Sequence, residues 1–169
     1  YFKEFIKPEQ EEALFNLLIV SLEKKFSIGK NFVWYTDIYL QKKTGSVPLN
    51  VPLIFTRNRI GYEGKLGYKN LTLSTGLEIR YHTAYKADGY SPPLGIFYYQ
   101  DSTSISNRPE ISAYFHFRIR NFRAFLRFEN LNSLTTTNSF GFRHHNFAAP
   151  GYPYPGLVIR VGVFWNFVN

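Results

Sequence analysis

Apolar and polar residues alternate one by one along most of this chain, and that pattern limits the fold more than any other feature. It is clearest over residues 71–82, 111–120 and 157–167, where residues of one parity are nearly all apolar. A period of two indicates a β-strand with two different faces, because successive side chains point to opposite sides of the backbone. The sequence therefore predicts an all-β protein built from two-faced strands.

The strict pattern also covers residues 123–129, and three earlier segments follow it less strictly: residues 14–26, 31–42 and 53–66. Together the segments predict about seven strands of about 10 to 14 residues, whereas a typical globular strand has about five or six. Ten residues that rise about 3.3 Å each, on a strand tilted by about 40°, climb about 25 Å. That height matches the apolar band of a transmembrane β-barrel.

Alternation alone does not say which face meets water, since a soluble lipocalin-like barrel also alternates, with its apolar face inward. Three features favour the membrane-type barrel: Arg and Lys recur on the polar face, aromatic residues gather near strand ends, and the connections are unequal in length. The aromatic residues that we expect to face lipid at the membrane interfaces are Trp34, Tyr68, Tyr81, Trp165 and Phe167.

Composition excludes several other classes of protein. The chain has no cysteine, which rules out a disulfide framework and a thiolate metal site. It has no run of about 18 apolar residues, which rules out a transmembrane helix. Its net charge of +8 is not concentrated in runs or along a helix, so we predict no nucleic-acid partner.

The connections between predicted strands alternate between short and long. Short turns are expected at residues 27–30, 67–70 and 120–122. The long links, rich in Gly, Pro, Ser, Thr, Asn and Tyr, are residues 43–52, 83–109 and 133–155. Outer-membrane barrels have short periplasmic turns and long extracellular loops, so we predict that these links are extracellular. Within the second link, residues 94–99 are expected to form a strand above the membrane.

Counting strands predicts that the chain is the C-terminal part of a larger barrel. With a periplasmic C-terminus, residues 14–26 would descend from the cell surface, yet single-chain bacterial barrels have even strand numbers and two periplasmic termini. Open sheet edges are also not tolerated in lipid. We therefore expect upstream strands or partner strands to close the barrel; if one strand is miscounted, an eight-stranded barrel is the alternative.

Residues 50–169 resemble the putative porins of Bacteroidetes outer membranes. The resemblance rests on PLIFTRNRIGYEGK at 52–65, GLEIRY at 76–81, YKADGYSP at 85–92, FYYQD at 97–101 and PGYP at 150–153. It implies an outer-membrane barrel several times longer than this chain, a transport role and no catalytic residues. The closing strand, residues 157–167, also resembles the signal read by the barrel-assembly machinery. It departs from that signal because the last aromatic residue, Phe167, is third from the end.

The charged residues of the polar face are predicted to face the lumen. They are Glu23, Lys25, Asp37, Arg57, Arg59, Glu63, Lys65, Glu78, Arg80, Arg118, Arg120, Arg123, Arg127, Glu129 and Arg160. Basic residues outnumber acidic ones, which predicts a mild preference for anions in a pore. The alternative is that Arg and Glu pair across strands and so rigidify the wall or anchor a plug.

Neither a metal site nor a catalytic site is predicted, and no other cofactor is expected. His144 and His145 are adjacent, so in an extended chain they point apart, and His82 and His116 lie on different strands. A metal site needs three or four converging ligands. No nucleophile motif surrounds a serine and no acid–base pair has suitable spacing, so we do not expect an enzyme.

Two functions fit these expectations. The first is a porin that passes small solutes by diffusion through a mildly cationic lumen. The second is a structural or accessory barrel subunit of a larger assembly, such as a secretion translocon or barrel-assembly complex. Fold alone does not separate them. Either would be an integral protein of the bacterial outer membrane, in contact with lipid and lipopolysaccharide and inserted by the barrel-assembly machinery; the second would also bind other outer-membrane proteins.

Overall fold

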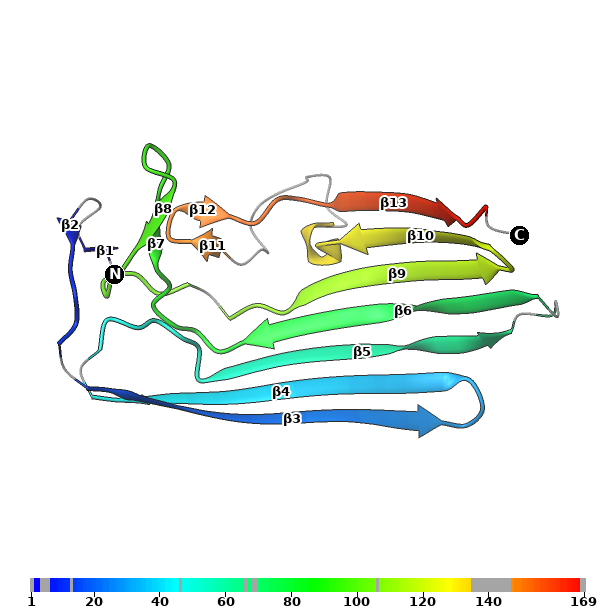
Figure 1. Ribbon diagram of the computed structural model, residues 1–169, viewed down its shortest axis with the longest axis horizontal. Coiled ribbons are helices and arrows are strands. Elements are labelled where there is room, and N and C mark those ends of the chain that lie inside the picture. Colours follow the sequence, from blue (N-terminus) through cyan, green and yellow to red (C-terminus); the bar gives the residue numbers. More distant parts are fainter. Residues whose placement is uncertain are drawn as a thin grey trace.

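One antiparallel sheet of seven long strands dominates the computed structural model, which describes residues 2–3, 7–12, 14–45, 47–65, 67, 70–105, 107–134 and 147–167 (Figure 1). The strands are β3 (Asn16–Ile28), β4 (Phe32–Thr44), β5 (Ile54–Lys65), β6 (Leu71–His82), β9 (Glu110–Ile119), β10 (Phe122–Glu129) and β13 (Val158–Trp165). They lie side by side in that order. The predicted antiparallel all-β fold is confirmed.

Short pieces of structure complete the described residues. They are β1 (Phe2–Lys3), β2 (Lys7–Pro8), β7 (Gly89–Ser91), β8 (Ile96–Tyr98), the 3₁₀ turn η1 (Leu131–Ser133), β11 (Phe147–Ala149) and β12 (Tyr152–Pro153). No helix in the described residues is both long and apolar enough to cross a membrane. The strand expected over residues 94–99 is β8, which pairs with β7 in a hairpin outside the main sheet.

The two ends of the sheet differ in their connections (Figure 1). At the turn end, β3 and β4 are joined through Gly29, whose φ of 66° suits glycine, and β9 and β10 through Arg120 and Asn121. At the loop end, longer segments connect β4 to β5, β6 to β9 and β10 to β13. Within the described residues the outer edges of β3 and β13 have no strand partner, so the sheet is open.

Strand β13, with eight residues, is shorter than the predicted residues 157–167, whereas β10, also with eight residues, agrees with the predicted residues 123–129 to within one residue. β10 stops because Asn130 adopts a left-handed conformation, with φ of 60°, and leads into the turn η1. β13 stops because its last ladder partner is Phe122, the first residue of β10. Beyond that point a single backbone hydrogen bond, from Asn166 N to the Asn121 carbonyl oxygen at 3.1 Å, continues the contact between the two segments.

The sheet has one apolar face that nothing in the described structure covers. Directly paired residues of an antiparallel ladder point to the same side, so the register assigns every strand residue to a face. One face carries Leu18, Val20, Ile60, Leu77 and Val161, and exposed fractions there reach 62% at Leu18 and 71% at Val161. In the described strands its charged residues are Lys24 and Lys42, both on the edge hairpin.

Aromatic residues gather on the apolar face at the turn end. The rings of Phe26 and Trp34 stack at 5.0 Å, and the rings of Trp165 and Phe167 at 5.2 Å. The Trp34 indole nitrogen donates a hydrogen bond to Asn58 Oδ1 at 3.1 Å. Tyr81 lies on the same face at the loop end, and Tyr68 falls outside the described residues. Their placement at membrane interfaces stays a prediction.

Candidate pore-lining face

The polar face holds nearly all the charged residues predicted to face the lumen. Rows of directly paired residues cross the sheet, such as Asp37, Arg57, Arg80 and Glu110 on four successive strands. Every residue of the predicted charged set lies on this face except Arg120, which is in the β9–β10 turn with φ of 48°. That the face lines a lumen stays a prediction.

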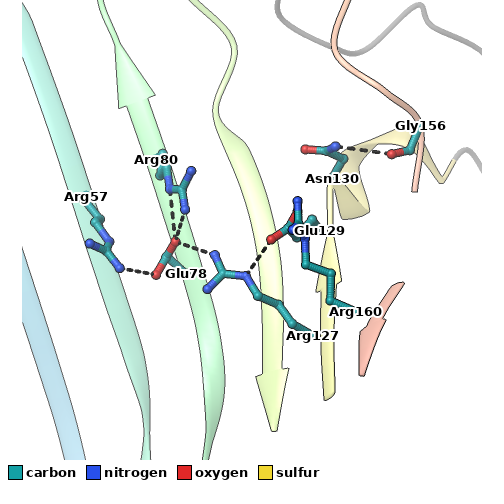
Figure 2. A network of polar contacts seen from close by, with 8 residues as sticks. All are labelled: Arg57, Glu78, Arg80, Arg127, Glu129, Asn130, Gly156 and Arg160. Atoms are coloured by element: carbon teal, nitrogen blue, oxygen red, sulfur yellow. Dashed lines mark hydrogen bonds and ion pairs between the residues drawn. The ribbon is translucent and has the colours of Figure 1, made fainter. Parts of the chain in front are cut away.

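Glu78 is the centre of a charged network in the middle of this face (Figure 2). Its side chain is only 2% exposed. Arg57 Nη2 donates to Oε2 at 2.9 Å, and Arg80 donates to Oε1 from Nε at 3.0 Å and from Nη2 at 2.8 Å. Arg127 Nη2 also donates to Oε1, at 2.8 Å. A carboxylate has about four acceptor positions, so the anion is fully satisfied.

Arg127 extends the network to the edge strand. It reaches Glu78 over Ser112, the β9 residue directly paired with Glu78, because a serine side chain is small enough to leave the space open. Its Nε forms an ion pair with Glu129 at 3.1 Å, and Arg160 Nε donates to the other Glu129 oxygen at 3.0 Å. We call this set, Arg57, Glu78, Arg80, Arg127, Glu129 and Arg160, the Glu78 network.

A second charged cluster lies nearer the β3 edge. The guanidinium of Arg59 stacks over the Tyr35 ring, 4.4 Å from its centroid, and lies 4.0 Å from Glu63 Oε1. Lys25 lies 3.7 Å from Glu63 and 4.8 Å from the Tyr35 ring. Tyr35 donates its hydroxyl hydrogen to the Glu63 carboxylate. Single contacts of this half-exposed kind contribute little, about 1 kcal/mol or less.

Two directly paired glycines of the sheet, Gly61 and Gly76, lie beside Tyr114, and we call these two glycines the glycine seam. Gly61 of β5 and Gly76 of β6 are directly paired, and Gly76 pairs with Tyr114 of β9. A Cβ atom on Gly61 would lie 2.5 Å from the Tyr114 hydroxyl oxygen, and one on Gly76 would collide with the Ile60 carbonyl oxygen. The seam therefore needs glycine at both positions, and the tyrosine ring covers the backbone that the glycines leave bare.

The turn end of the polar face differs from the Glu78 network because two of its cations lack an acidic partner among the described residues. One row there runs Lys65, Thr72, Arg118, Arg123 and Phe164 on five successive strands. Arg118 Nε donates only weakly to the Arg120 carbonyl oxygen, at 3.4 Å. In the described part of the chain no carboxylate forms an ion pair with Arg118 or Arg123. We call these two residues the turn-end pair.

A small cavity of about 300 Å³ opens at the loop end of the polar face. Its lining includes Asp37, Arg80, His82, Glu110 and Tyr154. Burial, reinforced by the Glu110 charge, raises the pKa of Tyr154 above its ordinary value, so the phenol stays neutral and can donate a hydrogen bond there. Acidic and basic side chains both line this cavity, so neither sign of charge dominates there.

Two charged residues of this face were not assigned to strands from the sequence. Glu110 stands before the regular alternation and was assigned to no strand, but it is the first residue of β9 and pairs with Arg80. Lys43 was placed in a link, although β4 runs to Thr44 and the Lys43 ammonium donates to the carbonyl oxygens of Val47 and Leu49. Strand ends are where a period-two pattern gives least information.

No metal-binding arrangement is evident in the described residues. There, no group of three or more His, Asp or Glu side chains could hold a metal ion. His82 is directly paired with Phe55, and His116 with Ser74 and Phe125, so the two histidines lie in separate rows. His144 and His145 fall outside the described residues.

Comparison with known proteins gives a family but no solved relative. No curated protein matches the chain, and no solved structure does. A family model described as "Putative porin" matches residues 1–169. The match spans every strand of the two-faced sheet, and the family's outer-membrane character agrees with an exposed apolar face opposite a charged one. This chain therefore belongs to the putative porin family, as the resemblance of residues 50–169 had predicted.

Proposed function

We propose that this sheet is part of the wall of an outer-membrane pore through which small solutes diffuse, with its polar face toward an aqueous lumen. The observation that carries the proposal is the separation of charge between the faces. The polar face holds nearly all strand charges, and the opposite face exposes large apolar side chains across the strands. Soluble monomers rarely expose apolar patches above a few hundred Å², so this face calls for lipid.

The reverse orientation is unfavourable on energetic grounds. Each unpaired charged side chain placed at the centre of a bilayer costs about 3 kcal/mol or more. Charged residues occur along the whole length of the polar face, with Arg59 and Glu78 away from both strand ends, so turning this face to lipid would place charge at that depth. The turn-end pair and Lys65 lie nearer the interface and have no described acidic partner, so they too favour water. Lys24 and Lys42 on the apolar face are long and flexible enough to extend toward the interface or the sheet edge.

Selectivity for anions would come mainly from the cations that have no partner. Within the Glu78 network two carboxylates offset part of the charge of four arginines, and three of the four donate to Glu78. The turn-end pair keeps its full positive charge toward the solute path. Fixed positive charge in a narrow aqueous passage raises the local anion concentration.

The same proposal assigns the chain no chemical step, so it is not an enzyme and uses no cofactor. It places the protein in the bacterial outer membrane, in contact with lipid and lipopolysaccharide and inserted by the barrel-assembly machinery. Contact with other outer-membrane proteins belongs to the accessory-subunit alternative.

The test is ion permeation through the native protein purified from outer membranes. In planar bilayers with a KCl gradient, the native protein is expected to conduct and to give a reversal potential on the anion side. Arg127→Glu and Arg118→Glu should each shift that potential toward cation preference, whereas Lys86→Gln, in the exposed β6–β7 link, should not.

Absence of conductance from a folded, heat-modifiable protein would overturn the pore proposal. If such a protein also co-purified stably with other outer-membrane chains, the accessory-subunit function would be favoured instead.

A further inference from the structure

Arg118 and Arg123 are a like-charge pair held together by the sheet. They are directly paired on β9 and β10, a position in which like charges repel each other. The row extends to Thr72 on one side and Phe164 on the other, and neither side chain can neutralise a cation. The sheet register therefore places the two arginines directly opposite each other on the polar face.

Two phenyl rings lie beside this pair on the polar face. Phe164 is 60% exposed and pairs directly with Arg123, and Phe125 is 42% exposed and pairs with His116 and Gly162. Gly162 makes room for the Phe125 ring, since a Cβ atom there would collide with it. Exposing these rings to water costs hydrophobic free energy that burial elsewhere would have recovered.

The arginines and the rings border one open cavity. It has a volume of about 630 Å³, and its lining includes His116, Arg118, Arg123, Phe125, Phe164 and, from the Glu78 network, Arg127. Pockets for small ligands span about 300 to 1,000 Å³ and combine apolar walls with a few placed polar groups. The His116 and Phe125 rings meet edge to face at 6.1 Å, which fixes one wall.

We propose that this cavity is a binding site for an amphipathic anion, a small solute with a carboxylate and an aromatic body. The carboxylate would bind between the guanidinium groups of Arg118 and Arg123, whose planar donors match its geometry. The aromatic body would cover Phe125 and Phe164. One such ligand relieves both unfavourable features, the repulsion of the two cations and the exposure of the two rings.

The proposal rests on the hydrated polar face of the proposed pore and adds a solute class to it. The Glu78 network does not offer such a site, because its arginines already donate to Glu78 or Glu129. A carboxylate entering there would compete with a carboxylate of the wall. At the turn-end pair no described carboxylate competes.

The test is equilibrium binding of 4-fluorophenylacetate to the full native protein in a non-ionic detergent. Fluorine NMR is used to monitor the binding. Two other probes separate the parts of the site: 4-fluorobenzyl alcohol, which has the ring without the charge, and trifluoroacetate, which has the charge without the ring. We expect saturable binding of 4-fluorophenylacetate, and binding at least about tenfold weaker for either other probe. Equal binding of the neutral alcohol, or no saturable binding of 4-fluorophenylacetate, would overturn the proposal without any mutation.

Variants then locate the site. The double change Arg118→Gln with Arg123→Gln should weaken 4-fluorophenylacetate binding about 100-fold, since each charge-assisted contact is worth about tenfold. Phe164→Ala should weaken it about tenfold. Lys86→Gln is the control that removes one positive charge away from the cavity, and it should bind as the native protein does. Undiminished binding by the folded double variant would place the ligand elsewhere and overturn the proposal.

Binding and permeation are measured separately, so the two proposals fail in different ways. Conductance without 4-fluorophenylacetate binding would sink the binding site and leave the pore. Binding that depends on the turn-end pair, in a protein that does not conduct, would sink the pore and leave the site.

Discussion

The Glu78 network and the turn-end pair place arginines on the same face of the same sheet in opposite electrostatic settings. In the network, Glu78 is nearly inaccessible and accepts from three arginines on three different strands. At the turn end, Arg118 and Arg123 lie next to each other without a described carboxylate. The comparison teaches that the number of arginines alone does not describe this face: some arginines bind carboxylates on neighbouring strands, and others have no described carboxylate partner.

The largest expected effect follows from removing the central anion. Glu78→Gln leaves three guanidinium groups around a neutral amide, so we expect unfolding to become easier by about 3 kcal/mol, as when a buried ion pair loses one partner. Urea unfolding of the protein in lipid vesicles, followed by tryptophan fluorescence, measures this. Glu63→Gln is the control, because Glu63 is partly exposed and its loss should cost less than about 1 kcal/mol. Equal stabilities for the two variants would contradict the network's structural role.

A direct comparison of one arginine from each region should give effects of different sign. Arg127→Gln removes contacts to both Glu78 and Glu129 and should destabilise the fold by about 1 to 2 kcal/mol. Arg123→Gln relieves like-charge repulsion and should be neutral or stabilising by about 0.5 kcal/mol. The same urea titration decides between them. A larger loss of stability for Arg123→Gln than for Arg127→Gln would contradict this comparison, because it would mean that Arg123 has a stabilising partner in the fold.

Ion selectivity, unlike stability, should depend more on the turn-end pair than on the Glu78 network. We expect Arg118→Gln with Arg123→Gln to lower the anion-to-cation permeability ratio about twofold, as a change of about 0.5 kcal/mol in the energy of a passing ion would do. Arg57→Gln with Arg80→Gln removes the same charge beside Glu78 and Asp37. We expect this network variant to change the permeability ratio less than the turn-end variant does. A larger change would mean that passing ions meet the network arginines and not the turn-end pair. Reversal potentials in a KCl gradient measure both.

Salt should act mainly on the turn end, and this is the smallest effect. Raising the salt from 0.1 M to 1 M shortens the screening length from about 10 Å to about 3 Å. The selectivity difference between native protein and turn-end variant should then shrink. The stability loss of Glu78→Gln should hardly change, because that carboxylate is buried. A salt-independent selectivity difference would mean that the turn-end cations act through packing.

The sequence predicted the strands and their faces well, for a local reason. A period of two can be recognised within one short segment of sequence, so the segments of β6 and β9 could be identified without knowing which strands they pair with. The antiparallel order of the sheet followed because each connection joins neighbouring strands. The end of β10 at Glu129 was predicted, but the end of β13 at Trp165 was not, since it depends on where the partner strand β10 begins.

Pairing of Arg with Glu across strands was one of the two interpretations of the charged face, but the particular partners of Glu78 could not be predicted, because they depend on the register between strands. Glu78 pairs directly with Arg59 and Ser112, yet its hydrogen bonds go to Arg57, Arg80 and Arg127. Which diagonal partner is reached depends on the space over Ser112 and on long, flexible side chains. The two phenyl rings of the further site did leave a signal: Ala124-Phe125-Leu126 and Val163-Phe164-Trp165 interrupt the alternation with three apolar residues in a row.

The glycine seam under Tyr114 has a consequence for how the sheet assembles. A slip of one residue between β5 and β6 would oppose Gly61 with Thr75 or Leu77, and Gly76 with Ile60 or Tyr62, turning side chains into the space that the phenol occupies. The position of Tyr114 on β9 is therefore compatible with one alignment of β5 and β6, the one in which the two glycines are directly paired. The seam thus makes the register of one pair of strands a condition for the packing of a third.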